Sequence, residues 1–277
     1  MSEPADRQPE AGANPSFWEQ FGSLLLAVAI ALGVRTFVVE PFRIPSESML
    51  PTLLVGDHLF VNKFAYGVKI PFTETRLPGL RGPERGDVVV FTVARDPRDP
   101  GRICPVDRCP GKPTEEFVKR IVGLPGETVE VRPDGTVRID GRLLERGDGG
   151  PDFINGVGTE LAVRDEDNGR CHYQVLDDRR MTGAVRRVKV EPDRYFMMGD
   201  NRDHSNDSRG WGTVRASEFK GPALLLYWSW DYNEGWLDLL NPLTWLRSEK
   251  RWDRFGDGLT CEAHDAGEGG ETPSRAP

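Results

Sequence analysis

The sequence lacks the marks of several common protein classes. It has a net charge of −8 and no basic patch interleaved with aromatic residues, so nucleic acid is not an expected partner. It shows no internal repeat and no glycine-rich phosphate loop. Its four cysteines and four histidines do not form two Cys/His pairs at zinc spacing, and His172 beside Cys171 supplies one ligand at best. We therefore expect no metal and no other cofactor.

Cysteine is scarce, but two of the four residues lie close together. Cys104 and Cys109 lie five positions apart in a loop rich in proline and glycine, and a disulfide there is the alternative to a metal site. A disulfide would imply an oxidising compartment outside the cytoplasm. The sequence leaves the pairing of the cysteines open.

Long apolar runs are scarce as well, and one lies near the N-terminus. Residues 21–34 carry no charge, and apolar residues resume after Arg35. As a helix, residues 17–39 span about 35 Å, enough for a hydrocarbon core of about 30 Å, which predicts a single membrane anchor. A cleaved secretory signal and a buried core helix are the alternatives. Only Arg7 is basic before the run, whereas a signal peptide begins with a basic region, so an uncleaved anchor is favoured.

The remaining residues are typical of a β protein. The 31 glycines, 22 prolines and short Val-rich stretches between turn signals predict a mostly β fold. Residues 132–186 are polar and rich in Asp, Arg and Gly, which indicates an insertion between two parts, 40–131 and 187–261, of one β core, and function is not expected to reside in this insertion. The polar ends, 1–16 and 262–277, are expected to be disordered. The expected strands are residues 58–61, 87–93, 117–122, 128–131, 137–139, 185–190 and 195–198.

Three segments carry side chains suited to chemistry. The first, residues 45–52, places Ser46 and Ser48 on a proline-bounded loop, with Ser48 nine residues beyond Val39. Nine extended residues reach about 30 Å, so anything that Ser48 attacks must lie near the membrane surface. The alternative is an ordinary Ser/Pro turn.

The second segment, residues 117–126, is a strand pattern with Lys119 among apolar neighbours, and it ends in a Pro-Gly turn. Strand alternation places Lys119 on the inward face and turns Arg120 outward. A lysine is ordinarily exposed, but burial would lower its pKa because the ammonium loses hydration.

The third segment, residues 198–209, follows an apolar strand and is dense in hydrogen-bonding side chains. A calcium loop does not fit, because Arg202 and His204 interrupt the pattern and Arg209 occupies a ligand position. A polar network that supports a site is favoured.

Together these segments resemble those of bacterial type I signal peptidases, the Ser/Lys-dyad peptidases of the S26 type. The likeness covers residues 41–51 (PFRIPSESMLP), 56–66 (GDHLFVNKFAY), 117–127 (FVKRIVGLPGE) and 199–209 (GDNRDHSNDSR), in the family's order. A fainter likeness runs through residues 227–231 and 251–259. Each segment alone would be modest, but four in series are specific.

The resemblance implies roles for the matching residues. Ser48 matches the nucleophile and Lys119 the general base, while Ser46 and the backbone N–H of Ser48 match the groups that bind the oxyanion. Met49 would line the substrate groove, and Ser205 would orient the lysine. The surrounding structural and network positions are matched by Asp207, Arg209, Arg120 and Asp200. Two departures, Glu47 where many relatives have Gly and His204 where many have Asn, affect preference and fine geometry rather than the dyad.

The proposed pair is chemically consistent. Lysine can act as a base at neutral pH only if its pKa falls from about 10.4 to about 7 or 8, a change of about 4 kcal/mol that burial on an apolar strand can supply. The resemblance then implies a membrane-bound serine endopeptidase that cuts signal peptides from exported preproteins, with shallow pockets for small residues in an Ala-x-Ala pattern.

The resemblance also implies an architecture and a location. The expected fold is an N-terminal transmembrane helix followed by a β-rich catalytic domain with a smaller inserted β subdomain, on the outer side of the cytoplasmic (inner) membrane. The excess of Lys and Arg after the apolar run, taken naively, favours the opposite orientation, but that rule is weak for a long translocated domain. The implied partners are signal peptides of exported preproteins, the lipid bilayer and the protein export machinery.

Other hypotheses remain beside this one. A histidine-dependent serine peptidase would use Ser48, His204 and either Asp200 or Asp207. A specialised Ser/Lys peptidase would mature one pilin or conjugation protein. A non-catalytic, membrane-tethered β protein would bind or scaffold exported chains, but the paired serines and the single lysine in an apolar strand argue against it.

Overall fold

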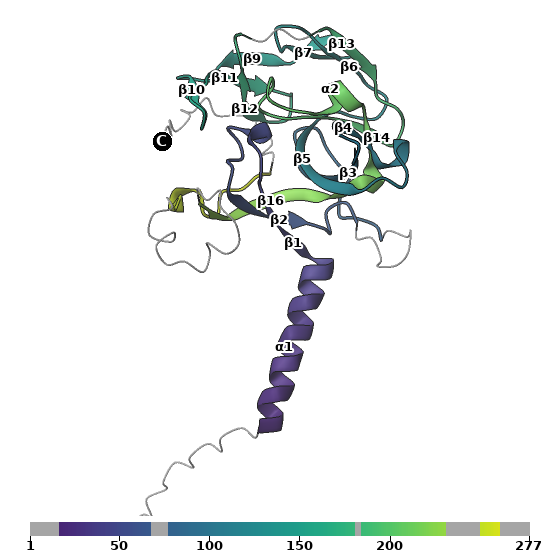
Figure 1. Ribbon diagram of the computed structural model, residues 1–277, viewed down its shortest axis with the longest axis vertical. Helices are drawn as coiled ribbons and strands as arrows, with labels where there is room; N and C mark the ends of the chain where they lie inside the picture. Colours follow the sequence, from purple (N-terminus) through teal and green to yellow (C-terminus); the bar gives the residue numbers. More distant parts are fainter. Residues whose placement is uncertain (1–16, 68–76, 181–183, 231–249, 261–277) are drawn as a thin grey trace, which may run out of the picture.

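The computed structural model describes residues 17–67, 77–180, 184–230 and 250–260, and it is mostly β, as the sequence predicts. One long helix, α1 (Phe17–Phe37), extends away from the body that the strands form (Figure 1). The two ends expected to be disordered lie outside the described residues.

The largest sheet has eight strands, and every neighbouring pair in it is antiparallel. Its order is β1 (Val39–Arg43), β2 (Asp57–Asn62), β16 (Phe219–Ser229), β3 (Val88–Asp96), β5 (Thr114–Gly123), β14 (Arg194–Met198) and β15 (Val214–Arg215), with β4 (Asp99–Pro105) paired to β3.

Two smaller sheets of four strands each lie mostly within the predicted insertion. One contains β9 (Glu145–Asp148), β10 (Phe153–Ile154), β11 (Glu160–Asp167) and β12 (His172–Asp177). The other contains β13 (Arg186–Lys189), β6 (Thr128–Val131), β7 (Val137–Ile139) and β8 (Arg142–Leu143). Because β6 and β13 pair with each other, the chain enters and leaves the 132–186 region at neighbouring positions. The division into a catalytic domain and an insertion stays a prediction.

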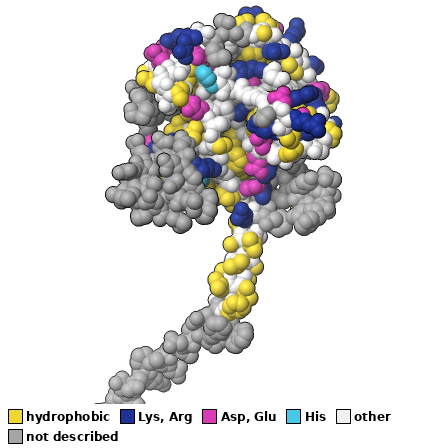
Figure 2. Space-filling model, in the orientation of Figure 1, with side chains coloured by type: hydrophobic (Ala, Val, Ile, Leu, Met, Phe, Trp, Pro, Cys, Tyr) yellow, Lys and Arg dark blue, Asp and Glu magenta, His cyan; other side chains and the backbone are white. Residues whose placement is uncertain are grey.

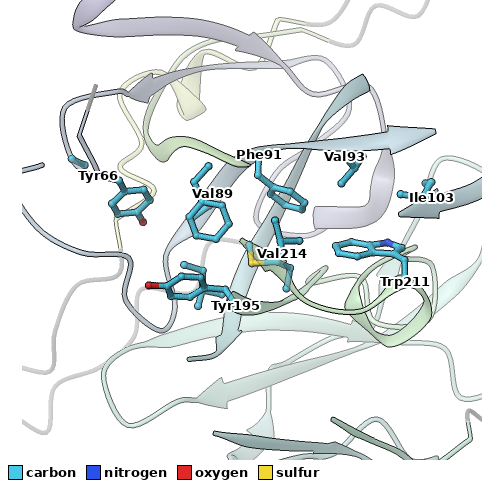
Figure 3. Packing of buried hydrophobic residues seen from close by; sticks show 12 residues of the cluster. Tyr66, Val89, Phe91, Val93, Ile103, Tyr195, Trp211 and Val214 are labelled. Carbon is cyan, nitrogen blue, oxygen red and sulfur yellow. The ribbon is translucent and has the colours of Figure 1, made fainter. Parts of the chain in front are cut away.

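Apolar side chains cover both faces of the sheet at β3, because alternate residues of this strand enter two different clusters. Val89 and Phe91 belong to the cluster drawn in Figure 3, which also contains Trp211 and Tyr195. Val90, on the other face, packs in a second cluster beneath the loop that carries Ser48. Full burial of such a side chain stabilises the fold by about 1.5–3 kcal/mol. The strands that hold the site are therefore fixed from both sides.

All seven expected strands are present, with ends that differ by up to three residues, but several further strands were not predicted. The longest of these is β16, whose sequence contains Gly221 and Pro222 and so looks like a turn. In the fold, Gly221 has φ +157°, and a Cβ there would lie 2.2 Å from the carbonyl oxygen of Asn62. The glycine thus permits close approach of two paired strands rather than a chain reversal.

Helix α1 covers most of the predicted anchor, although Val39 already belongs to β1. Figure 2 shows apolar side chains along the projecting part of this helix. The exposed ones are Phe21, Leu24, Leu25, Leu26, Val28, Ile30, Leu32 and Val34. In the part of the chain that the structure describes, no helix is long and apolar enough to cross a membrane.

A disulfide joins Cys104, near the end of β4, to Cys109, and the two Cα atoms are 6.2 Å apart. This confirms the short disulfide that the sequence favoured over a metal site. Cys171 is also disulfide-bonded.

Candidate active site

The loop between β1 and β2 presents Ser48 to solvent while anchoring its neighbour in the core. Glu47–Met49 form a short 3-10 turn, closed by a hydrogen bond from Leu50 N to Glu47 O of 3.1 Å. Met49 points inward and is only 1% exposed, whereas Ser48 is half-buried. Burial of the methionine therefore fixes the serine on the accessible side of the turn.

Lys119 lies directly beside this serine. It sits on β5 opposite Val89 of β3, is 3% exposed, and places its Nζ 2.6 Å from Ser48 Oγ. The same nitrogen donates a hydrogen bond of 2.9 Å to the carbonyl oxygen of Val118 and lies 5.2 Å from the centre of the Phe117 ring. The amine of Lys119 thus contacts neighbouring residues of its own strand and points toward the hydroxyl of Ser48.

Burial lowers the pKa of Lys119 from 10.5 to about 8. Loss of hydration is the largest cause, and the positive charge of Arg209 acts in the same direction. The carboxylates of Asp207 and Asp200 oppose the change without cancelling it. At neutral pH a useful fraction of this amine is therefore unprotonated and able to accept a proton.

Ser46 lies at the mouth of the same site. Its hydroxyl is 3.3 Å from Ser48 Oγ, and the residue is exposed. This places a second hydroxyl next to the candidate nucleophile, where charge would develop on a substrate carbonyl oxygen. The role of Ser46 in binding that oxygen stays a prediction.

Arg120 does not turn outward, contrary to the prediction from strand alternation. It is 4% exposed and forms a bidentate ion pair with Asp200, with N···O distances of 2.8 and 2.6 Å. Thr52 donates a hydrogen bond of 2.6 Å to the same carboxylate, and the guanidinium lies 4.0 Å from the centre of the Tyr173 ring. The alternation itself holds, but both faces of β5 are covered here, so the second face is buried too.

The segment after β14 is held by a second ion pair. Asp207 caps the short helix α2 (Ser208–Trp211) and binds Arg209 with N···O distances of 2.8 and 2.7 Å. Although burial opposes charge, this guanidinium keeps the pKa of Asp207 below its usual range. Asp207 also accepts a hydrogen bond of 3.0 Å from the backbone nitrogen of Gly199, which fixes the turn next to the site.

Ser205, predicted to orient the lysine, lies close to the turn that holds Ser48. Its Oγ is buried, and a Cβ built on Gly199 would lie 2.3 Å from this Oγ and 2.4 Å from the carbonyl oxygen of Ser48. Within the described residues, the Ser205 hydroxyl makes no hydrogen bond to Lys119. The orienting role stays a prediction.

The predicted insertion supplies buried partners to this region that the sequence did not identify. Glu166 of β11 accepts hydrogen bonds of 2.6 and 2.5 Å from Arg202 and of 2.6 Å from the hydroxyl of Tyr173. Burial raises the pKa of a carboxyl, but the Arg202 guanidinium outweighs it and keeps the pKa of Glu166 below its usual range. In the sequence these charged residues resemble a solvated surface, because their partners are far apart along the chain.

A pocket of about 420 Å³ opens beside the dyad. Its walls come from β1, β3, β4, β5, the serine loop and the segment after β14. The lining residues are Phe42, Ile44, Pro45, Ser46, Ser48, Met49, Arg95, Gly101, Ile103, Glu115, Glu116, Phe117, Val118, Lys119, His204 and Asn206. Met49 is among them, and its contact with a substrate stays a prediction. The lining includes apolar side chains, among them Phe42, Ile44 and Val118, which suit uncharged side chains of a substrate.

His204 does not occupy the position of a base. Its Nε2 lies 3.3 Å from Asp178, while the contact to Ser48 Oγ is made by Lys119. Asp200 and Asp207 are both engaged with arginines. The arrangement therefore favours a Ser/Lys pair over a Ser/His/Asp triad.

Comparison with known proteins identifies the family. The family model described as "Signal peptidase, peptidase S26" matches residues 17–228. The chain is 35% identical to a protein named signal peptidase I from Pseudomonas aeruginosa, over 78% of this chain and 74% of the relative. It is 34% identical to one from Leptolyngbya laminosa, over 82% and 86% of the two chains. It is 30% identical to one from Rickettsia typhi, over 85% and 91%.

Proposed function

The chain belongs to the signal peptidase family, peptidase S26, and on this basis we propose that it removes signal peptides from exported preproteins with Ser48 as nucleophile and Lys119 as general base. It is a serine peptidase, a hydrolase that acts on peptide bonds. The observation that carries the residue assignment is the contact of 2.6 Å between a buried lysine nitrogen and the serine hydroxyl.

The first half of the reaction forms an acyl-enzyme. Neutral Lys119 takes the proton of Ser48 Oγ as this oxygen attacks the carbonyl carbon that precedes the cut. The negative charge that develops on the carbonyl oxygen is stabilised by the backbone N–H of Ser48 and the hydroxyl of Ser46. The lysine ammonium then protonates the leaving amine, which becomes the new N-terminus of the mature protein.

The second half of the reaction restores the enzyme. Lys119, neutral again, takes a proton from a water molecule that attacks the ester carbonyl. The signal peptide leaves with a new carboxylate, and the proton returns to Ser48 Oγ. One buried amine therefore serves as the base in both steps, and its pKa of about 8 allows it to accept a proton near neutral pH.

An open strand edge leads from the pocket to the dyad. β5 pairs with β3 over residues 114–120, but its strand pairing with β14 involves only Arg120, Ile121 and Gly123. The other edge of the stretch from Thr114 to Lys119 has no strand partner among the described residues. An extended peptide can add to such an edge, which would bring its alternate side chains to the pocket and its carbonyl to Ser48. We infer that the residues before the cut bind in this way, with small residues nearest the apolar side chains of the pocket.

Although α1 by itself is not long and apolar enough to cross a membrane, we also propose that it inserts into the lipid bilayer of the cytoplasmic membrane and that the β body lies on the outer side. Support comes from the apolar side chains that α1 leaves exposed and from its position apart from the body (Figures 1 and 2). The Cys104–Cys109 disulfide supports the outer side, because disulfides persist in oxidising compartments. The protein export machinery, which delivers preproteins to that side, is the expected partner there.

The alternative functions are less well supported. The relatives carry the general name signal peptidase I, which does not favour a peptidase dedicated to one pilin or conjugation protein. A scaffold without catalysis gives no reason for a lysine with a lowered pKa beside a serine.

A peptide assay tests the assignment. The purified full chain in detergent should cleave a fluorogenic Ala-x-Ala peptide after the second Ala, with the product identified by mass spectrometry. Ser48→Ala and Lys119→Ala should each remove turnover, whereas Lys112→Met, at a half-exposed lysine paired with Asp96, should not. Turnover that survives Ser48→Ala would end the proposal.

Location has its own test. After fractionation, the chain should stay with membranes during carbonate extraction, and protease added to spheroplasts should digest the β body. Release by carbonate would contradict insertion of α1, and protection from protease would contradict the outer location.

A further inference from the structure

Asn201 touches the turn that carries Ser48 at two points. It follows directly after Asp200, is fully buried, and donates from its backbone nitrogen to the carbonyl oxygen of Ser48 at 3.2 Å. Its side-chain Nδ2 donates to the carbonyl oxygen of Glu47 at 3.1 Å. A carbonyl oxygen can only accept, so the amide nitrogen must face it. Asn201 thus holds the two peptide groups on either side of the nucleophile.

The contact with Glu47 determines more than the position of that residue. The carbonyl of Glu47 and the N–H of Ser48 belong to one planar trans peptide group, in which the oxygen and the hydrogen point in opposite directions. Leu50 N donates to the same oxygen at 3.1 Å, so two donors converge on it. Holding the oxygen from one side therefore fixes the direction in which the Ser48 N–H points on the other.

We propose that Asn201 is a positioning residue for oxyanion binding: its side chain orients the Glu47–Ser48 peptide so that the Ser48 N–H faces the oxygen on which negative charge develops. This rests on the proposed function, because it assumes that Ser48 is the nucleophile. Asn201 does not touch the reacting atoms. It removes a rotation that would otherwise turn the donor away, and a donor fixed beforehand stabilises the transition state without reorganising.

The inserted sheet holds Asn201 in turn. Leu176 of β12 forms a parallel bridge with Asn201, in which Leu176 N donates to Asp200 O and Arg202 N donates to Leu176 O, both at 2.9 Å. Arg202 is further held by its buried ion pair with Glu166. The region predicted to be non-catalytic therefore supports the backbone on which the oxyanion geometry depends.

The test compares two asparagines that both contact Glu47. Asn201→Ala removes the bond to the peptide oxygen, while the control, Asn155→Ala, removes a contact of 3.4 Å to the carboxylate of Glu47 and leaves the peptide alone. We expect Asn201→Ala to lower the plateau kcat by about 10- to 100-fold with little change in KM, part of the effect of losing one oxyanion donor. Asn155→Ala should stay within about twofold of wild type, since it leaves that donor unchanged.

A second measurement reports the oxyanion directly. A peptide aldehyde with an Ala-x-Ala sequence adds Ser48 Oγ to its carbonyl carbon, and the resulting hemiacetal oxygen occupies the oxyanion position. The inhibition constant of the aldehyde should rise in Asn201→Ala by the same factor by which kcat falls. The midpoint of the acidic limb of the pH profile, which Lys119 sets, should not change. A change in protein folding alone would not couple these two quantities.

Asn201→Leu keeps the size of the side chain and serves if the alanine variant does not fold. The inference is overturned if either folded variant keeps wild-type kcat, if kcat falls while aldehyde binding is unchanged, or if Asn155→Ala loses as much. Failure of the proposed function looks different, because turnover would then survive Ser48→Ala in the wild-type background.

Discussion

Replacing Lys119 by methionine should abolish activity and stabilise the fold. The lysine has a pKa of about 8 in the folded chain and 10.5 in the unfolded chain, so keeping it charged inside the protein costs about 3 kcal/mol below pH 8. Methionine has a similar length and no charge to bury. The hydrogen bonds from Lys119 to Ser48 and Val118 are lost in the variant, which at about 1 kcal/mol each offsets about 2 kcal/mol and leaves a gain of about 1 kcal/mol near pH 7.

The stabilisation should depend on pH in a defined direction. Between pH 8 and 10.5 the unfolded lysine binds a proton that the folded one does not, so wild-type stability rises with pH across this window relative to the variant. The advantage of Lys119→Met is therefore full below pH 8 and disappears toward pH 10.5.

Denaturant unfolding followed by tryptophan fluorescence, at pH 7 and at pH 10, measures this difference for the full chain in detergent. Lys112→Met is the matched control, because it makes the same substitution at a half-exposed lysine. A Lys119→Met variant that is less stable than wild type at pH 7, or whose advantage does not shrink as pH rises, would refute the reasoning.

The remaining predictions concern activity toward the Ala-x-Ala peptide. Wild-type kcat/KM should rise about tenfold per pH unit below about pH 8 and level off above it, because only neutral Lys119 accepts the proton; Lys119→Arg should be inactive across the profile. Gly199→Ala should lower kcat by about 100-fold, since its Cβ would lie 2.4 Å from the carbonyl oxygen of Ser48 and displace the nucleophile; kcat near wild type would contradict that crowding. Ser46→Ala should lower kcat by about 10²–10³ with KM nearly unchanged, and a change confined to KM would argue against its oxyanion role. His204→Asn should keep most of its activity, and a dead variant would favour a histidine base.

Sequence alone located the dyad because its two members stand out locally. Ser48 lies on a proline-bounded loop, and Lys119 is a single charge in an apolar strand. The two residues are 71 positions apart in the chain, and the distance of 2.6 Å between Lys119 Nζ and Ser48 Oγ depends on how β5 and the serine loop pack on a common core. No local sequence pattern contains that information. Only the resemblance to the family predicted, before the structure, that these two residues act as a pair.

What the sequence did not reveal was how buried charges are paired. Arg120 was expected to face solvent because alternation says only which face a residue occupies, and not whether that face is covered. The strand β11 was not predicted because ELAVRDED lacks an apolar alternation, although Glu166 within it is fully buried by its contacts with Arg202 and Tyr173. From the sequence alone such residues are predicted to lie on a polar surface, because their partners are distant in the chain.

The direct passage from α1 into β1 has a consequence for the choice of cleavage position. Val38 alone separates the two elements, and Lys63 fastens the junction through hydrogen bonds of 3.1 Å to the carbonyl of Val38 and 3.3 Å to that of Arg35. Because no flexible linker separates the helix from the sheet, the fold fixes the distance between the end of the helix and the serine hydroxyl. If α1 lies in lipid as proposed, the cut falls at a nearly constant elevation over the bilayer, so the spacing between a substrate's apolar segment and its scissile bond is selected by the scaffold before any side chain is recognised.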